Sequence, residues 1–327
     1  MSTDHATPTT AGLTESIGRG SLALAVATVQ LLVFAGFVLV DRPTLYVPVA
    51  LASAAGLGYA SGRGWFGMAT ATLGSVLLLA LALPLGLFVA RQKPDLLADT
   101  VTDPAVHQML YLTVYAPLVA AVGALLFGVP LAYLLARGFP GQSVVAALVD
   151  LPLVVPHSVA GILILFGFGR RGIFPGFSVL GTMLGMILAL TFVAAPFAVN
   201  AARDAFEAVD ERLEYAARSH GASRAQTFWR VSLPLAGRGI ATGGVLAWAR
   251  GVSEFGAVAV VAYTVDFFYP PAGGTVPGTH APVYIYKQYN QAGLDASGSV
   301  AFILLVLSAC IFLLVRWLGF GKLGGAS

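Results

Sequence analysis

Two charged residues stand four positions apart in an otherwise apolar stretch near the end of the chain. Arg250 and Glu254 both fall within the run 239–263. Residues four apart share one face of a helix, so their side chains can pair. A charge in a bilayer costs roughly 2.5–3.5 kcal/mol on insertion scales, so it must be paired or face water. The pair is therefore either a structural ion pair that locks helices together or a gate beside a pathway, and Glu254 itself would repel an anion.

A second polar group follows two prolines in the apolar run 143–168. Pro152 and Pro156 each remove a helix hydrogen bond, so they predict a break in this run. Freed backbone at membrane depth is tolerated where it faces protein or a water-filled cavity. His157 and Ser158 then present polar groups to a pathway, or His157 is a buried donor and Ser158 bonds back to its own helix.

The most polar segment is EYAARSHGASRAQTFWRVSLPLA, residues 214–236. Asp210 can cap a helix that begins at Glu211, and Gly221 can end it in a left-handed conformation. Ser223 and Gln226 match a capping box that starts a second short helix, and Pro234 ends the unit or begins the next membrane helix. The segment therefore predicts two short helices joined by a glycine turn, which either dock into a partner's groove or form an ordinary solvated loop.

The sequence contains none of the motifs for ATP binding, metal binding or catalysis that we looked for. No Gly-x-x-x-x-Gly-Lys-Ser/Thr pattern occurs, so the chain does not bind ATP through a P-loop. We find no metal-ligand spacing of His, Asp and Glu and no nucleophile–base set within the apolar runs. We therefore expect no catalytic residue, no metal site and no bound cofactor, and a membrane-embedded enzyme is the weakest functional hypothesis.

The composition indicates that membrane-spanning helices carry the polar residues described above. The 327 residues are 57% hydrophobic and 10% charged, whereas soluble domains have roughly 25% charged residues. A spanning helix needs roughly 20 mostly apolar residues. We predict an all-α integral membrane protein with about eight transmembrane helices, in the runs 21–40, 44–61, 67–90, 109–137, 143–168, 178–201, 239–263 and 298–318. A formal net charge of +3 without a basic stripe argues against nucleic-acid binding.

Lysine and arginine are enriched on the side of the membrane that carries segment 202–238. Since cytoplasmic loops carry the excess of these residues, we expect this segment and both termini to be cytoplasmic. Residues 1–20 are predicted to be a disordered tail rather than a cleaved signal peptide. The loops 91–108 and 264–297 are then external, and the Pro/Gly content of the second forbids a continuous helix. We expect no strands.

The polar segment resembles the EAA loop of ABC-transporter permeases. Tyr215-Ala216-Ala217 is followed after three residues by Gly221, after nine more by Val231, and then by Leu233-Pro234. The family has Glu-Ala-Ala, Gly, Ile and Leu-Pro at the same spacing. The resemblance implies that this loop couples the permease to its ATPase. Tyr215 stands where the family has glutamate, which leaves open whether Glu214 replaces that charge or the contact is aromatic.

Three further stretches narrow the resemblance. LPLVVPHSVAGI (151–162), ARGVSEFGAVAVVAY (249–263) and APVYIYKQYNQAGLDAS (281–297) resemble permeases for molybdate, tungstate or sulfate, and the last two are closest to archaeal-type tungstate/molybdate permeases. The resemblance covers about residues 67–318. It implies a type I importer permease domain over 64–327, with the helix pair of 21–63 as an addition.

The resemblance also implies partners and a mechanism. We expect a homodimer in the cell membrane that binds two ATPase subunits, which carry ATP and Mg²⁺, and an external oxyanion-binding protein. Closure of the ATPase dimer would move the docked loop and open the permease by alternating access. Two alternatives stay open: a sulfate or thiosulfate permease of the same class, and a secondary transporter, which would favour internal repeats and paired intramembrane carboxylates.

Overall fold

The computed structural model describes residues 10–170, 172–173, 176 and 178–320. The chain divides into two compact units, residues 1–92 and 93–327, and each is described by itself. Both units are built mostly from helices, which confirms the predicted predominance of helical structure. The described part contains four helical stretches long and apolar enough to cross a membrane and three shorter apolar helices, so the number of about eight spans stays a prediction.

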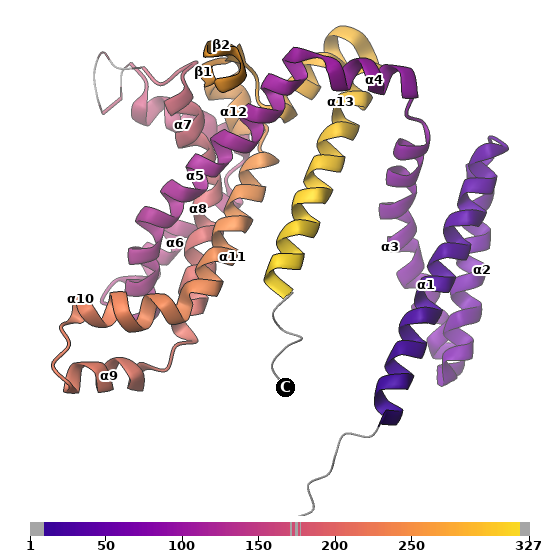
Figure 1. Cartoon of the computed structure of the whole chain (residues 1–327), viewed down its shortest axis with the longest axis horizontal. Helices are drawn as coiled ribbons and strands as arrows, with labels where there is room; N and C mark the ends of the chain where they lie inside the picture. The colour runs from indigo at the N-terminus through magenta and orange to yellow at the C-terminus, as the bar shows by residue number, and fades with distance from the viewer. Residues whose placement is uncertain (1–9, 171, 174–175, 177, 321–327) are drawn as a thin grey trace, which may run out of the picture. The chain divides into compact units, whose positions relative to one another are not determined.

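The N-terminal unit holds three helices joined by short turns (Figure 1). They are α1 (Thr10–Leu39), α2 (Tyr46–Gly58) and α3 (Gly64–Ala90), with the short helical turns η1 (Pro43–Leu45) and η2 (Tyr59–Arg63) between them. Gly58 of α2 and Gly67 of α3 touch, because a Cβ atom built on Gly58 would lie 2.3 Å from the Gly67 carbonyl oxygen. Such small residues let helices approach closely in a membrane.

Two boundaries differ from the sequence-based expectation. Helix α1 begins at Thr10, inside the predicted tail 1–20, whose first nine residues lie outside the described part. Helix α3 groups by contact with α1 and α2 rather than with the residues after Gln92, because its main partner is α2.

The larger unit runs from an amphipathic surface helix to a long final helix. In chain order its elements are α4 (Pro94–Thr102), α5 (Pro104–Arg137), α6 (Gln142–Val154), α7 (His157–Phe168), α8 (Met183–Glu207), α9 (Glu211–Ser219), α10 (Arg224–Thr227), η3 (Phe228–Ser232), α11 (Leu233–Val252), α12 (Gly256–Val261), β1 (Val265–Tyr269), η4 (Pro270–Ala272), β2 (Gly274–Gly278) and α13 (Ala281–Phe320).

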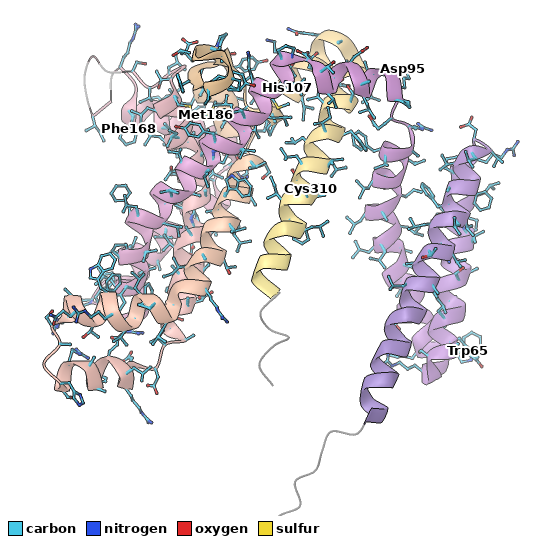
Figure 2. The ribbon with its side chains drawn as sticks, viewed as in Figure 1. Trp65, Asp95, His107, Phe168, Met186 and Cys310 are labelled. Atoms are coloured by element: carbon cyan, nitrogen blue, oxygen red, sulfur yellow. The ribbon has the colours of Figure 1, made fainter. Side chains whose placement is uncertain are left out.

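The core of this unit is the packing of α5, α8 and α11. Alanines line the contact: Ala121 and Ala124 of α5, Ala194 and Ala198 of α8, and Ala247 of α11 form one buried cluster. Lipid tails are as apolar as leucine, so helices in a bilayer associate through close packing of small residues rather than through burial alone. A second cluster joins α5, α7, α8, α12 and β1, and includes Met186, which Figure 2 labels.

Two of the predicted spans are each two helices in the structure. The run 143–168 is divided at Val155–Pro156 into α6 and α7, which confirms the predicted break. Pro152 lies inside α6, so Pro156 is the residue that ends the first helix and precedes the second. The run 239–263 is divided at Ser253–Phe255 into α11 and α12, a break that we did not predict.

The predicted loop 264–297 contains a β-hairpin, contrary to our expectation of no strands. Strands β1 and β2 pair antiparallel, with Val265 opposite Gly278 and Tyr269 opposite Gly274. Val265 and Phe267 are buried while Asp266 and Phe268 are exposed, the alternation of a half-buried strand. Five residues are too short a run to stand out from the Pro/Gly-rich sequence around them. Helix α13 begins at Ala281, earlier than predicted, and bends at Gly293, where φ is +82°.

Candidate functional site

The polar segment forms the predicted pair of short helices at one end of the larger unit (Figure 1). The Asp210 carboxylate accepts a hydrogen bond from the Arg212 backbone N–H at 2.9 Å and caps α9. Gly221 follows the helix with φ +90°, a conformation that L residues rarely adopt. The predicted capping box of Ser223 and Gln226 is present, with both of its hydrogen bonds formed.

The segment ends where α11 begins. The π-helical turn η3 leads directly into Leu233, the first residue of α11, and Pro234 occupies the first turn of that helix. Because η3 runs directly into α11, Pro234 lies within a continuing helix, and the wider π-helical turn accommodates a proline that cannot donate a backbone hydrogen bond. Of the two predictions for Pro234, the structure has the second, in which it begins the next long helix.

Glu214 points into the protein and anchors α9. Its residue is only 5% exposed. Oε1 accepts hydrogen bonds from Arg137 Nη2 at 2.6 Å, from Arg137 Nε at 3.1 Å and from Ser232 Oγ at 2.7 Å, while Oε2 accepts from Tyr133 Oη at 3.2 Å. Arg137 also donates to the Phe206 carbonyl at 3.0 Å. One carboxylate therefore ties α9 to α5, through Arg137 to α8, and to the turn that begins α11.

The ionised form of Glu214 is stabilised by these donors. Burial alone would raise the pKa of the carboxyl group, but the hydrogen bonds from Arg137 and Ser232 and the charge of Arg137 outweigh it, and the pKa is lowered. A buried charge is tolerated only when it is paired and hydrogen-bonded. Glu214 is thus held as a carboxylate on the inner side of α9.

Tyr215 points the other way. It is 58% exposed, and the Arg218 guanidinium lies 4.6 Å from the centre of its ring. Leu213 and Ala216 are also exposed, Ala217 is partly buried, and Gly221 is open to solvent at the turn. The outward face of α9 therefore offers an aromatic ring, and the neighbouring Glu214 carboxylate is not available to a partner.

The predicted pathway residues come together where α6 meets α7 and α11 meets α12. Arg250 Nη2 lies 2.7 Å from Glu254 Oε2, so the predicted pair is formed. His157 joins it, with Nδ1 at 3.2 Å from Glu254 Oε2 and Nε2 at 2.9 Å from Arg250 Nη2. Arg250 Nη2 lies 3.0 Å from His157 Nδ1 as well, so the guanidinium is placed against both ring nitrogens of the imidazole.

Glu254 is the buried centre of this cluster. It is fully buried, and its Oε1 also accepts a hydrogen bond from the Ala257 backbone N–H at 2.8 Å, at the start of α12. His157 is not the buried donor of the structural interpretation, because its side chain is 44% exposed. Ser158 is exposed on the first turn of α7.

An open cavity of about 590 Å³ lies against the same cluster. Pro156, His157 and Arg250 contribute to its wall, whereas Glu254 lies behind Arg250 and does not. Its lining residues are Val154, Val155, Pro156, His157, Arg250, Ser253, Phe255 and Gly256. Two helix breaks that are distant in sequence thus form one open depression, with a mostly apolar wall and three polar side chains, His157, Arg250 and Ser253. Within the described residues, no group of three or more His, Cys, Asp and Glu side chains is placed to hold a metal ion.

Sequence reasoning missed the partners of Glu214 and part of the cavity. Arg137 and Tyr133 lie about 80 residues before Glu214, and only their four-residue spacing at the end of an apolar run hints at a shared helix face. Ser253 and Phe255 flank Glu254, and the sequence signal that α11 ends before them is weak, because no proline lies at this break.

Comparison with known proteins is consistent with this geometry. A family described as "binding-protein-dependent transport system inner membrane component" matches residues 124–321. The chain is 43% identical over 251 residues to the molybdate/tungstate transport system permease protein of Pyrococcus abyssi, covering 76% of this chain and 93% of the relative. It is 42% identical over 258 residues to a probable molybdenum ABC transporter permease protein of Haloferax volcanii, covering 78% of this chain and 91% of the relative.

More distant similarities extend to sulfate permeases and to solved importers. A probable sulfate transport system permease protein of Chlorokybus atmophyticus is 32% identical over 250 residues, covering 73% of this chain and 84% of the relative. A bacterial ABC transporter that imports alginate is similar in fold, with a TM-score of 0.61 at 17% identity, covering 81% of this chain and 99% of that one. A methionine ABC transporter matches with a TM-score of 0.50 at 22% identity, covering 66% and 95%.

Proposed function

The chain belongs to the binding-protein-dependent transport system inner membrane components, and from that premise we propose that it is the permease of an ATP-driven importer for molybdate or tungstate. It is a transport subunit and not an enzyme. The substrate assignment rests on one observation: relatives named for molybdate/tungstate transport are 40–43% identical over more than three quarters of the chain.

The exposed outward face of α9 is an argument that a separate ATPase subunit docks there. Hydrolysis of ATP must come from another chain, which carries ATP and Mg²⁺, because this chain has no P-loop. Leu213, Tyr215 and Ala216 form an exposed face on a helix whose other side is fixed by Glu214. A helix held firmly to the transmembrane body suits a lever that a docked partner moves.

The remaining partners follow from the same assignment. The permease would form a homodimer in the cell membrane, bind two ATPase subunits on the side of α9 and α10, and receive the oxyanion from an external binding protein. Both termini would then be cytoplasmic. Closure of the ATPase dimer would move α9, and through it the helices bound by Glu214, so that the pathway opens alternately to the two sides.

Reconstitution tests this proposal. We expect liposomes containing the chain, its ATPase and the oxyanion-loaded binding protein to take up molybdate or tungstate only when ATP is supplied. ATP hydrolysis should rise when the loaded binding protein is added. Uptake by the chain alone, driven by an ion gradient, would show a secondary transporter instead.

A sulfate permease is the second candidate, favoured by the relatives of about 30–32% identity that carry that name. The same liposomes distinguish it. Competition of unlabelled sulfate against labelled tungstate should be weak if the first proposal is right, and strong if sulfate is the substrate.

A further inference from the structure

We propose that the cavity at the α6–α7 and α11–α12 breaks is a transient binding site for the oxyanion, with Arg250 as its cationic contact and Glu254 as the residue that positions Arg250. This inference rests on the proposed function, because it names a site for that substrate within the permease. The cavity carries the inference: it has a volume of about 590 Å³ and is open, and Arg250, His157 and Ser253 are its polar side chains.

Arg250 has donors left for a ligand. Its side chain is 17% exposed, and its Nη2 is taken by Glu254 and His157. Nη1 has only a long contact, 3.4 Å to Ser253 Oγ. A guanidinium offers five N–H donors in a fixed planar fork that suits the oxygens of an oxyanion. Two of its three nitrogens can therefore turn to an anion without breaking the pair with Glu254.

The backbone adds donors at the same place. Helix α7 has 12 residues and begins at His157, directly after Pro156, with no side-chain cap on its first turn. The first N–H groups of a helix have no intrahelical acceptor, and the helix dipole favours an anion there. Pro156 has no N–H, so among the residues that line the cavity His157 contributes the one free N–H of this first turn.

Glu254 does not repel an anion from the cavity, because its carboxylate lies outside the cavity wall and both of its oxygens already accept hydrogen bonds. It is fully buried and does not line the cavity. Oε2 is bound by Arg250 and His157, and Oε1 by the Ala257 N–H. An anion in the cavity meets the guanidinium before the carboxylate. This explains how an acidic residue can lie beside an anion pathway.

The site is built for weak binding. A water molecule occupies about 30 Å³ of liquid, so the cavity holds a tetrahedral oxyanion together with part of its hydration shell. The positive charge is also partly compensated by Glu254. Both features suit a step in transport, because an ion that binds too tightly in a pore does not leave it.

Cysteine labelling tests the site without relying on uptake. Cys310 is the single cysteine of the chain, so Cys310→Ala gives a cysteine-free background. In that background Ser253→Cys places a thiol in the cavity, and the exposed Ser143→Cys on α6 is the matched control. The detergent-solubilised complex with its ATPase is labelled with an anionic and with a cationic methanethiosulfonate.

We expect the thiol at 253 to react faster with the anionic reagent, relative to the control thiol, by about tenfold, because a positive site enriches anions locally. Millimolar tungstate should slow the reaction at 253 and not at 143. Adding Arg250→Gln should abolish both the preference and the protection. Arg250→Lys, which keeps the charge, should retain part of both, so a lost response in the glutamine variant is not mere misfolding.

The outcomes separate the two proposals. If position 253 does not label, shows no preference for the anionic reagent, or is not protected by tungstate, the cavity is not an anion site, whatever the uptake assay gives. If uptake of tungstate fails in the wild-type complex while protection is seen, the proposed function is wrong and the anion site stands. The exposed Arg238→Gln on the same helix should leave preference and protection unchanged.

Discussion

Glu214 shows how a single side chain can fix the orientation of a surface helix. With a residue exposure of 5% it receives hydrogen bonds from Arg137, Ser232 and Tyr133. A buried ion pair contributes little net stability compared with an apolar pair, but removing one partner leaves the charge of the other buried and uncompensated. The pair therefore acts mainly to specify where α9 lies.

Glu214→Gln should destabilise the protein strongly, because Arg137 is then left without its counter-charge. We expect a loss of about 3 kcal/mol, the lower end for a buried pair, because the Arg137 side chain is 15% exposed. The matched control is Glu207→Gln, which breaks the more exposed pair with Arg203 and should cost about 0–1 kcal/mol. Thermal unfolding in detergent measures both, and equal shifts of the midpoint would contradict the assignment.

His280 gives the unfolding free energy a dependence on pH. It is fully buried, and neither ring nitrogen has a hydrogen-bond partner among the described residues. Burial lowers its pKa to about 4, and the Glu254 backbone lies near enough to oppose this shift without forming a hydrogen bond to either ring nitrogen. The unfolded chain then binds a proton at a higher pH than the folded one does, so stability falls as the pH falls from about 6.5 towards 4.

We expect a loss of about 2 kcal/mol at pH 5 relative to pH 7.5. The lowered pKa of Glu214 acts in a more acidic window, because its stabilisation is fully present above the ordinary glutamate pKa and is lost as the pH falls through the lowered pKa of the folded protein. His280→Leu should flatten the dependence between pH 7.5 and 5, whereas His107→Leu, at an exposed position, should not. Thermal unfolding midpoints of the wild type and both variants, measured between pH 7.5 and 5, test this expectation.

The sequence predicts the local structure and contacts of a residue well when its partners are near it in the chain. The capping box of Ser223 and Gln226, the left-handed Gly221, the break at Pro156 and the pair of Arg250 with Glu254 all depend on neighbours within four residues. The Arg137–Glu214 pair could not be predicted, because 77 positions separate the two and no spacing rule joins them. The same holds for His157, which meets Arg250 across 93 positions.

At the scale of elements, the turn between α9 and α10 sets the shape of the surface that we propose as the docking site of the ATPase. Gly221 has φ +90° with open space around it, so a side chain there is opposed by backbone strain rather than by a clash. Strain of this kind costs about 1–3 kcal/mol and is worst for β-branched residues. A substitution can therefore distort the loop while the transmembrane helices stay intact.

Gly221→Val should weaken co-purification of the ATPase, whereas Gly221→Asn, which tolerates positive φ, should keep most of it. The matched control is Gly237→Val in α11, where the backbone is helical and a Cβ atom would meet nothing within 4 Å. Membrane insertion and yield should match the wild type in all three variants. Normal recovery of ATPase with Gly221→Val would contradict a docking role for this loop.

Element boundaries were harder to predict than element existence. The break between α11 and α12 has no proline, and its signal is only the polar Ser253-Glu254 before Gly256. Gly256 is needed there, because a Cβ atom on it would lie 2.8 Å from the His157 Cβ. That close approach of α12 to α7 is a tertiary contact, so composition and periodicity could not reveal it.

At the scale of the molecule, α11 links the docking loop to the cavity. Ser232, bound to Glu214, directly precedes α11, and Arg250 lies near its other end. Twenty helical residues span about 30 Å, the thickness of the hydrocarbon core. In the proposed mechanism, a displacement of α9 would be transmitted along this helix to Arg250, the residue that we assign to the anion. The proposed mechanism needs this kind of connection.

Internal contacts and similarity to relatives place the N-terminal boundary of the transport unit at different residues. Contacts group α3 with the N-terminal helices, yet the Haloferax volcanii relative covers 78% of the chain, about 255 of 327 residues. That exceeds the 235 residues from Lys93 to Ser327, so the matched region includes part of α3. The Pyrococcus abyssi relative, with 251 matched residues that make 93% of it, has only about 270 residues in all. We infer that α3 belongs to the permease and that α1 and α2 are the addition.

Truncation tests this boundary through the parity of membrane crossings. A chain that starts at Gly64 lacks α1 and α2, two crossings in our interpretation, so α3 and everything after it keep their orientation. A chain that starts at Lys93 lacks three, which places α5 against its preferred orientation. We expect ATP-dependent oxyanion uptake and a cytoplasmic C-terminal fluorescent reporter from the first chain and the loss of uptake from the second. If the Lys93 chain transports as well as the Gly64 chain, α3 is part of the addition.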